Sequence, residues 1–568
     1  MNSTFELPIF YVEEKQRLDE NIIDDLELLE LNEDSEVRQG LLETIIQPKS
    51  KIGFERLNTL SEYYTNNKKF LKDTQKILGG WKADENIESK QKQYDDFYEL
   101  WKNIKNDENF IDRYYYVDIE FFKFLNNSPL FLQILSLYNL VSPILSLILP
   151  IILLIVPFFM LKFSGIAITL DSYYKVLVNI FSKHALGNIF TVMGDISWEK
   201  RLYAVVSIVF YFFSIYQNSL VCYRFYKNFG TIHDDLFSLK EYLTTTVENM
   251  NILEQSCMKY TSYVPFLQSI YPHKQHCMRL VETLNVITQF DLKNLTSKSK
   301  QIGYIMKHFY EFHTNKDIQN TIEFSLGVNA FMEHMNGLNE LRREKLINKC
   351  KFGKNTKLKN AYFPHLIHNE PVKNDIDLSK NIAITGPNAS GKTTTLKATL
   401  FNLIFSQSFG YGFYSGATIS PYNRIHCYLN IPDTSGRDSL FQAEARRCKE
   451  IIESLEDGKR HFCIFDELFS GTNPNEACAS SYGFIKFLIK QKNIDFILTT
   501  HLMDLCKKID RMMTNNHMYV ERLDDYNFNY TFKMISGISN VKGGLKVLAD
   551  LHYPKYILDE ANEALKNI

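Results

Sequence analysis

The feature that most constrains this chain is the segment NIAITGPNASGKTTT, residues 381–395. A short apolar strand leads into the pattern G-x-x-x-x-G-K-[ST], and a helical pattern follows, which is the context that a phosphate-binding loop requires. Gly386 and Gly391 allow successive backbone N–H groups to face a phosphate. Lys392 adds a cation for the β- and γ-oxygens, and Thr393 supplies a hydroxyl for Mg²⁺. The predicted phosphate-binding residues are Gly386, Pro387, Asn388, Ala389, Ser390, Gly391, Lys392, Thr393 and Thr394.

Length and composition limit what the rest of the chain can be. With 568 residues the chain is too long for one ordinary core, so about three or four domains are expected. A charged fraction of 23% beside a hydrophobic fraction of 45% excludes a disordered chain. The net charge of -2 excludes a nucleic-acid footprint spread over the whole chain, so any DNA contact must come from a local patch. The nine cysteines form no C-x-x-C pair, which indicates reduced thiols in a cytosolic environment.

A long uncharged stretch occupies residues 124–161, and its most apolar part is PILSLILPIILLIVPFFML. A bilayer core of ~30 Å requires about 20 apolar residues, so this stretch is long enough to cross a membrane. Pro143, Pro150 and Pro157 interrupt it at regular spacing, which a membrane helix tolerates better than a soluble one. We therefore expect a transmembrane helix at about residues 141–161.

A second uncharged run, residues 202–223, lies between Arg201 and Arg224 and contains four tyrosines. If it is a second transmembrane helix, the parts of the chain before and after the pair lie on the same side of the membrane. An ATP-binding domain places that side in the cytosol, although the connecting loop carries lysines and adds no support from the positive-inside rule. The alternative for both runs is a buried hairpin in a large soluble core.

The remaining chain divides by pattern. Apolar residues recur at helical spacing before the uncharged stretches and again after them. Residues 342–359 carry eight Lys or Arg and one acid, which favours either a solvated linker or a contact with the phosphates of nucleic acid or anionic lipid. Short apolar runs then alternate with helical patterns, as in an α/β fold. The predicted regions are a helical region 1–125, a membrane region 126–224, a helical core 225–345, a basic linker 346–360 and an ATPase domain 361–568.

Two further short strands end in side chains suited to nucleotide chemistry. The apolar residues 461–465 lead into Asp466 and Glu467. In a P-loop ATPase an acid at the first position holds Mg²⁺, and the next carboxylate can orient the attacking water. Residues 496–500 lead into His501, which is well placed to sense the γ-phosphate, although a lone histidine is usually structural. The segment between these motifs, residues 435–444, lacks the LSGGQ signature of transporters.

This ordered set of motifs resembles the MutS family of DNA mismatch-repair ATPases. The family's loop, G-P-N-x-x-G-K-[ST]-T, matches residues 386–394 throughout, and Asn374-Asp375 is similar to the N-D pair that precedes the loop strand. The segments 466–472 and 500–501 resemble the family's D-E-x-x-x-G-T and T-H motifs. The similarity also includes the S-x-F-x-x-E segment at Ser439, Phe441 and Glu444, and a C-terminal pattern at Gly537, Ser539, Gly544, Ala549, Pro554 and Ala561.

The resemblance covers about residues 361–568 and implies an α/β P-loop ATPase domain of the ABC/MutS type, preceded here by an all-α region with two transmembrane helices. It implies a dimer that binds and hydrolyses ATP with Mg²⁺ and binds DNA. The expected catalytic residues are Lys392, Glu467 and His501, the expected Mg²⁺ ligands are Thr393 and Asp466, and Ser439 is expected to complete the ATP site of the partner chain.

This sequence also departs from the family. Phe469-Ser470 stands where the family usually has Gly-Arg, and the Phe-x-Glu of the mismatch-reading domain is not recognisable. Because the two apolar stretches are foreign to soluble repair enzymes, the chain resembles a membrane-anchored MutS-related branch, with the ATPase domain on the cytosolic side. The alternative is a membrane-bound ABC-like ATPase that acts on a non-DNA partner in transport or membrane remodelling. An ATP-gated scaffold that barely hydrolyses is less consistent with Glu467.

Overall fold

The computed structural model describes residues 4–29, 31–33, 36–82, 87–181, 198–285, 301–429, 439–523, 528–541 and 543–566. The chain forms two compact units. Unit 1 contains Asp95–Val247 and Gln275–Glu323, and unit 2 contains Thr4–Tyr94, Glu248–Lys274 and Phe324–Ile568. These units do not follow the boundaries expected from the sequence, because residues 4–94 join the unit that holds the ATPase region.

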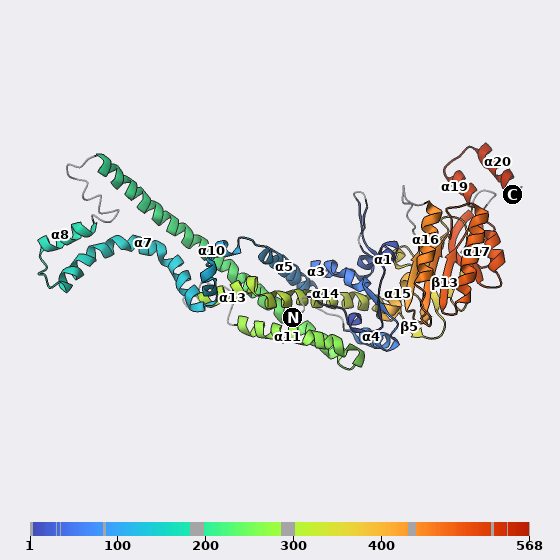
Figure 1. Cartoon of the computed structure of the whole chain (residues 1–568), viewed down its shortest axis with the longest axis horizontal. Coiled ribbons are helices and arrows are strands. Elements are labelled where there is room, and N and C mark those ends of the chain that lie inside the picture. Colours follow the sequence, from blue (N-terminus) through green and yellow to red (C-terminus); the bar gives the residue numbers. More distant parts are fainter. Residues whose placement is uncertain are drawn as a thin grey trace. The chain divides into compact units, whose positions relative to one another are not determined.

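A six-stranded sheet forms the centre of the C-terminal part of unit 2 (Figure 1). Its strands, in spatial order, are β11 (Arg424–Tyr428), β12 (His461–Asp466), β13 (Ile494–Thr499), β8 (Ile382–Thr385), β14 (Thr514–Arg522) and β15 (Phe528–Ser536). The first five run parallel, and β15 is antiparallel to β14. Because parallel strands are covered on both faces, β8, β12 and β13 are almost wholly buried, as their continuous apolar runs predict.

Helices connect these strands and cover the sheet. They are α15 (Lys392–Phe409), α16 (Leu440–Glu453), α17 (Pro474–Lys490) and α18 (Met503–Ile509), followed by the C-terminal α19 (Gly544–Asp550) and α20 (Lys555–Lys566). Phe465, Phe496 and Ile485 belong to a buried cluster between the sheet and α17. The alternation of strands and helices is the α/β architecture that the sequence predicts for this region.

A second sheet shows that the predicted basic linker, residues 346–360, is not a linker. This five-stranded sheet has the order β7 (Asn374–Asp377), β6 (Lys357–Ala361), β10 (Gly416–Ile419), β5 (Asn348–Phe352) and β9 (Tyr411–Gly412). Cys350 and Leu358 are buried, whereas their lysine neighbours in β5 and β6 are exposed. Lysines that alternate with buried residues have the period of two that a half-buried strand requires.

The N-terminal part of unit 2 contains strands as well as helices, so the region before the ATPase domain is not all-α as expected. Its elements are η1 (Pro8–Tyr11), β1 (Lys15–Arg17), α1 (Glu20–Asp25), β2 (Leu31–Glu33), β3 (Glu36–Arg38), α2 (Leu41–Ile46), α3 (Lys51–Glu55), η2 (Leu57–Ser61), β4 (Tyr63–Thr65) and α4 (Lys68–Gly80). β1 pairs with β4, and β2 pairs with β3.

Polar contacts attach this N-terminal part to α15 and to β5. Gln407 donates from Nε2 to the Thr65 carbonyl at 3.2 Å, and Lys397 pairs with Glu27 at 2.9 Å. Gln75 donates to the Cys350 carbonyl at 2.9 Å. The helix that begins at the phosphate-binding loop is therefore packed against residues that lie more than three hundred positions earlier in the chain.

Unit 1 is helical in its described part. It contains α6 (Phe110–Arg113), η3 (Glu120–Asn127), α7 (Pro129–Phe163), α8 (Leu170–Phe181) and α13 (Ile302–Thr314). It shares α5 (Ile87–Lys105), α10 (Trp198–Cys257), α11 (Val264–Leu284) and α14 (Lys316–Arg343) with unit 2, which also contains η4 (Thr261–Tyr263) and η6 (Pro364–Leu366). Stacked aromatic pairs form its core, such as Phe97 with Tyr242 at 3.8 Å between ring centroids and Trp101 with Phe312 at 5.3 Å.

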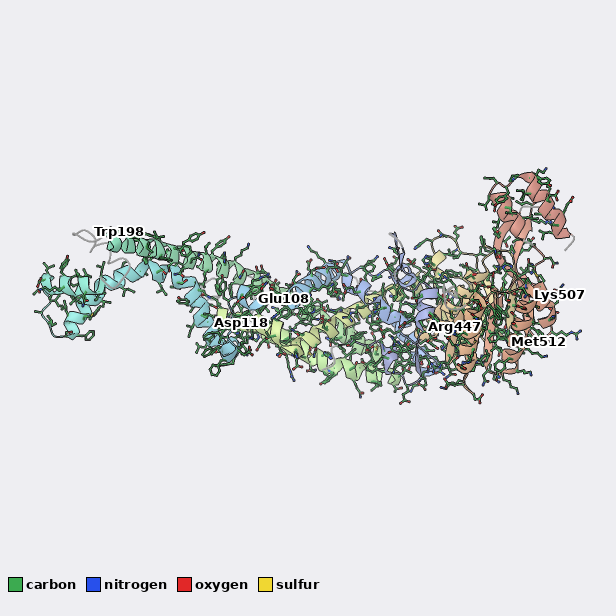
Figure 2. All side chains as sticks on the ribbon, turned by 45° about the horizontal axis from the view of Figure 1, so that its top comes forward. Glu108, Asp118, Trp198, Arg447, Lys507 and Met512 are labelled. Atoms are coloured by element: carbon green, nitrogen blue, oxygen red, sulfur yellow. The ribbon has the colours of Figure 1, made fainter. Side chains whose placement is uncertain are left out.

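Within unit 1, α7, α8 and the first part of α10 extend beyond the end where α13 packs (Figure 1). Trp198, at the start of α10, is 72% exposed (Figure 2). α7 runs through Pro143, Pro150 and Pro157 as one helix. At its other end it lies so close to α13 that a Cβ on Gly303 would come within 2.0 Å of the Pro129 carbonyl oxygen.

The two predicted transmembrane helices, at about 141–161 and 202–223, fall within the longer helices α7 and α10. Among the described residues one helical stretch, Pro129–Ile148, is long and apolar enough to cross a membrane, with a mean hydropathy of 1.7 and 22% of its most apolar window buried. The second run lies inside α10, which continues from Trp198 to Cys257 through charged residues. The helix has no end at either boundary of the run.

Candidate functional site

The predicted phosphate-binding loop connects the buried strand β8 to α15. Gly391 stands at the N-cap of α15 with φ of 93°, and Ala389 has φ of 59°. Both angles lie in the left-handed region that glycine adopts without strain. A Cβ on Gly386 would come within 2.8 Å of the Ser390 hydroxyl, so the loop has no room for a side chain there. The first turn of α15 consequently points its free N–H groups into the loop, where they favour an anion.

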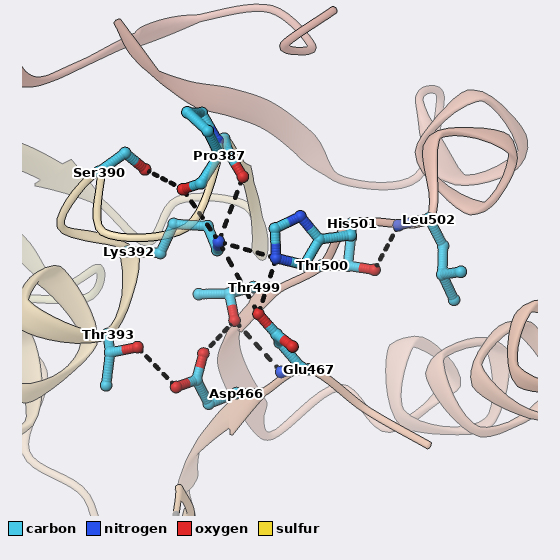
Figure 3. A network of polar contacts seen from close by, with 11 residues as sticks. Pro387, Ser390, Lys392, Thr393, Asp466, Glu467, Thr499, Thr500, His501 and Leu502 are labelled. Carbon is cyan, nitrogen blue, oxygen red and sulfur yellow. Dashed lines mark hydrogen bonds and ion pairs between the residues drawn. The ribbon is translucent and has the colours of Figure 1, made fainter. Parts of the chain in front are cut away.

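Lys392 is the buried cation of the site, with an exposed fraction of 5%. Its Nζ donates to the carbonyls of Gly386 at 3.2 Å and Pro387 at 3.3 Å (Figure 3). The same nitrogen lies 3.0 Å from His501 Nε2 and 3.8 Å from a Glu467 oxygen. Burial lowers the pKa of Lys392, and the nearby carboxylates oppose that shift.

Asp466, the last residue of β12, links the loop helix to the neighbouring strand. The Thr393 hydroxyl donates to Asp466 Oδ2 at 2.7 Å, and the Thr499 hydroxyl at the end of β13 donates to Oδ1. A carboxylate and a threonine hydroxyl side by side are the hard oxygen ligands that Mg²⁺ prefers. The chemistry of this pair therefore fits the predicted Mg²⁺ site.

Glu467 lies directly beyond β12 and faces the lysine. Its φ of 54° lies in the left-handed region, and its N–H donates to the Thr499 hydroxyl at 3.2 Å. One carboxylate oxygen lies 2.8 Å from His501 Nε2. The hydrogen bond with His501 is the main cause that lowers the pKa of Glu467, and the charge of Lys392 adds to it. A carboxylate with a lowered pKa stays ionised near neutral pH and can orient a water molecule.

Strand order explains why His501 reaches this network. β13 lies between β8 and β12, so its carboxyl end falls between the loop and the acidic pair. The Thr500 N–H donates to the Ile384 carbonyl at 3.1 Å, and the Thr500 hydroxyl accepts from the Leu502 N–H at 3.0 Å (Figure 3). These bonds hold the turn that carries His501 against the loop strand.

The remaining predicted site residues lie in the phosphate-binding loop or at the start of α16. Asn388 and Ala389 are exposed at the tip of the loop, whereas Pro387 and Ser390 are buried and joined by a bond of 2.7 Å from the Ser390 hydroxyl to the Pro387 carbonyl. Ser439 lies outside the network of Lys392. It is the exposed N-cap of α16 and forms a capping box with Gln442. Residues 435–438, in the segment without LSGGQ, lie outside the described residues.

The C-terminal segment around Ser539 and Gly543 packs against β8 and the phosphate-binding loop. The Ser539 N–H donates to the Thr385 hydroxyl at 2.9 Å. A Cβ on Gly543 would come within 2.7 Å of Pro387, so the chain passes close to the loop at this point. The C-terminal segment thus supports the loop strand from a position that local sequence patterns do not indicate.

The structure adds a cavity of about 520 Å³ beside the start of α15 that the sequence reasoning missed. Its lining includes Gly391, Thr394, Val372 and Phe532. Phe532 comes from β15, and its ring would lie 3.2 Å from a Cβ on Gly391. Apart from the loop residues Gly391 and Thr394, the sequence signal at this cavity was the Asn374-Asp375 pair, of which Asn374 lines it.

Asn374 holds the strand that carries Phe532. Its amide donates to the Phe532 carbonyl at 3.0 Å, and its carbonyl oxygen accepts from the Met534 N–H at 2.8 Å. The asparagine is buried, with 7% of its surface exposed. Asn374, which belongs to the Asn374-Asp375 pair noted in the sequence, therefore holds the strand that forms one wall of the cavity.

A phosphate-binding loop after one strand, an acidic pair after a second and a histidine after a third, all at the carboxyl edge of a mostly parallel sheet, define a P-loop ATPase-like domain. The family model of MutS domain V matches residues 382–568, which contain these three strands and their motifs. Within the P-loop class the domain is thus similar to MutS domain V.

This chain is also similar in sequence to parts of several known proteins. Endonuclease MutS2 of Clostridium novyi (strain NT) is 24% identical over 299 residues, which cover 51% of this chain and 36% of the relative. Endonuclease MutS2 of Clostridium botulinum (strain ATCC 19397 / Type A) is 27% identical over 189 residues, which cover 33% and 24%. DNA mismatch repair protein MSH3 of Scheffersomyces stipitis is 27% identical over 213 residues, which cover 35% and 21%.

The aligned regions thus span between about a fifth and about a third of the relatives' own lengths. Together with the match to domain V they support MutS-family membership. They give no support for a separate membrane-anchored branch.

Proposed function

We propose that this chain binds and hydrolyses ATP at the site formed by the loop after β8. The observation that carries the proposal is the convergence of Lys392, Thr393, Asp466, Glu467 and His501 in one polar network, although they come from three separate strand ends (Figure 3). Each of these side chains has a function that phosphoryl transfer requires: charge neutralisation, metal binding and orientation of the attacking water.

Each residue of the site has a separate role in the proposed ATP binding and hydrolysis. Lys392 and the N–H groups of residues 386–394 would hold the β- and γ-phosphates, and Thr393 and Asp466 would hold Mg²⁺, which supplies charge stabilisation when bound. Glu467 orients the attacking water. His501, which lies within 3.0 Å of both Lys392 and Glu467, senses the γ-phosphate.

The cavity beside α15 is the proposed position of the nucleotide base. It adjoins the loop through Gly391 and Thr394, and the ring of Phe532 offers an aromatic face to a planar base. An apolar pocket of this size beside a cluster of polar groups is typical of a small-molecule site. The cavity thus adds specificity for a nucleoside triphosphate over inorganic triphosphate.

We also propose that the protein works as a dimer on DNA. The support is the match to MutS domain V and the similarity to proteins named as an endonuclease and a DNA mismatch repair protein. Ser439 is exposed at the N-cap of α16, so it is available to complete the site of a second copy. ATP binding would close the dimer and move the helical regions.

Membrane association is a further part of the proposal, with the ATPase domain on the cytosolic side. The observation that favours it is the reversed polarity of α7. Its apolar side chains point outward, as in Leu147 with 58% and Ile151 with 55% exposed, whereas Ser136 and Ser142 are buried. Polar groups that face neighbouring helices and apolar groups that face outward are typical of helices in lipid.

The decisive experiment measures the ATPase rate of detergent-purified protein alone, with matched duplex DNA and with mismatched duplex DNA. We expect turnover that requires Lys392 and that changes with DNA. A preference for mismatches would place recognition in residues 1–345. Turnover that ignores DNA would favour the alternative, a membrane-bound ABC-like ATPase with a non-DNA partner, and turnover that survives Lys392→Ala would contradict the site itself.

A further inference from the structure

Glu444 is a buried carboxylate outside the network around Lys392. It lies in the second turn of α16 and has an exposed fraction of 2%. Its oxygens accept three hydrogen bonds: from the Ser470 N–H at 3.0 Å, from the Ser470 hydroxyl at 2.9 Å and from the Gly471 N–H at 3.2 Å. All three donors belong to the loop that follows Glu467.

This loop has a conformation that needs support. Glu467 and Phe469 both have φ in the left-handed region, 54° and 57°, although neither is glycine. Such angles cost free energy for residues with a Cβ, and they persist when surrounding contacts hold them. The hydrogen bonds to Glu444 hold the loop at Ser470 and Gly471, the two residues directly after Phe469.

Apolar contacts join the same two segments. The rings of Phe441 in α16 and Phe469 in the loop lie 5.6 Å apart. Gly471 packs so tightly against the start of α16 that a Cβ there would come within 2.7 Å of the Phe441 nitrogen. The first two turns of α16 and the loop after Glu467 therefore form one packed body.

We propose that Glu444 is a positioning residue that couples the N-terminus of α16 to the water-orienting carboxylate of Glu467. Any displacement of α16 would pull on Ser470 and Gly471 and would change the backbone angle that aims Glu467 at Lys392. The inference rests on the proposed ATPase function, and it deepens that function.

The test compares Glu444→Ala with wild type, with Lys392→Ala as the blank and Glu453→Ala as the matched control. Glu453 lies on the same helix and has 64% of its side chain exposed in a pair with Lys449. Each variant is measured for its maximal ATPase rate and for its dissociation constant for a fluorescent ATP analogue. Circular dichroism reports whether each variant is folded.

We expect Glu444→Ala to lower the maximal ATPase rate by about ten-fold and to leave nucleotide affinity within about two-fold. The reason is that the substitution misplaces Glu467 but leaves the phosphate-binding loop, residues 386–394, unchanged. Glu444→Gln retains one acceptor for Ser470 and should recover part of the rate. Ser470→Ala removes one of the three hydrogen bonds and keeps the helix intact, so it should give a smaller loss of rate with unchanged affinity. This variant keeps the proposal testable if Glu444→Ala does not fold.

Two results would contradict the role of Glu444 and leave the proposed ATPase function standing. One is a wild-type rate in Glu444→Ala or in Ser470→Ala, and the other is a loss of nucleotide affinity in parallel with the rate, which is the signature of a merely structural residue. A wild-type chain without Lys392-dependent turnover overturns the proposed ATPase function instead, and the Glu444 inference falls with it.

Discussion

The six-stranded sheet of unit 2 and helix α7 of unit 1 arrange polar and apolar side chains in opposite ways. In the sheet the apolar residues of β8, β12 and β13 are buried, and the polar residues meet where the strands end. In α7 most of the large apolar residues are exposed, although Leu132 and Leu161 are buried, and two serines and an asparagine are buried as well. Tyr211 of α10 donates to the Ser146 carbonyl at 2.8 Å, and Asn218 donates to its hydroxyl.

Whether a buried polar or an exposed apolar side chain is favourable therefore depends on what surrounds that region. A buried polar group is favourable when hydrogen bonds satisfy it, both in a protein core and in lipid. An exposed apolar face is unfavourable in water and favourable in lipid, because the hydrophobic effect then stabilises insertion. The sheet thus has the arrangement expected in water, and α7 has the arrangement that the proposed membrane association requires.

The largest effect is expected for Lys392→Ala. The substitution removes the buried cation of the loop, so ATP binding and turnover should fall to the background level. Nucleotide binding and phosphate release measure this. The control is Lys507→Ala, which removes an exposed cation of α18 that pairs with Asp504 (Figure 2). Wild-type turnover in Lys392→Ala would contradict the assignment of the site.

Glu467→Gln should lower the maximal ATPase rate by about 10²–10⁴-fold while nucleotide stays bound, because the loop is intact and only the water-orienting carboxylate is lost. Single-turnover measurements separate binding from hydrolysis. We also expect this variant to accumulate as an ATP-bound closed dimer. Unchanged hydrolysis would assign the orientation of water to another group.

Leu147→Arg tests the other side of the comparison. A charge at the middle of a helix in lipid costs about 3 kcal/mol, so partition into membranes should fall by about 100-fold. The measurement is recovery in the pellet after a carbonate wash of membranes. Phe487→Arg, on an exposed position of α17, is the control and should have no effect. Release of the wild-type chain by carbonate would contradict insertion and favour a buried hairpin.

Phe532→Ala should weaken ATP binding by about five- to ten-fold through the loss of an aromatic contact with the base. Binding of inorganic triphosphate should not change, because that ligand has no base. Isothermal titration with both ligands makes the comparison, and Tyr519→Ala removes an exposed aromatic residue of β14 as a control. An equal loss for both ligands would show that the cavity does not hold the base.

The smallest effect concerns pH. His501 and Lys392 lower the pKa of Glu467 below its ordinary value of 4.5. Its ionised form therefore stabilises the fold above pH 4.5, and this contribution disappears as the pH falls further, through the folded-state pKa. Because Glu467 is 40% exposed, the change should be below about 1 kcal/mol. Melting temperatures of wild type and Glu467→Gln should converge at acidic pH, and a constant difference would contradict the pairing.

Local patterns in the sequence were sufficient to find the residues that meet at the site. The loop motif, the acidic pair and the histidine each follow a short apolar strand, and strands that end in polar residues meet at one edge of a parallel sheet. The catalytic roles of these residues stay predictions until the substitutions are made. The two sheet strands at residues 348–361 were missed because their lysines dominated the composition and concealed the period of two.

The loop predicted to bind phosphate and the α/β character of the C-terminal region could both be read from local patterns, because both depend on residues within a few positions of one another. The folded chain was needed to show that β13 lies between β8 and β12, that Phe532 lines a cavity beside Gly391 and that Glu444 accepts hydrogen bonds from Ser470 and Gly471. It also decided that the polar face of α7 is buried. The physical reason is that these relations depend on hydrogen bonds and packing between segments far apart in the chain, which no local periodicity records.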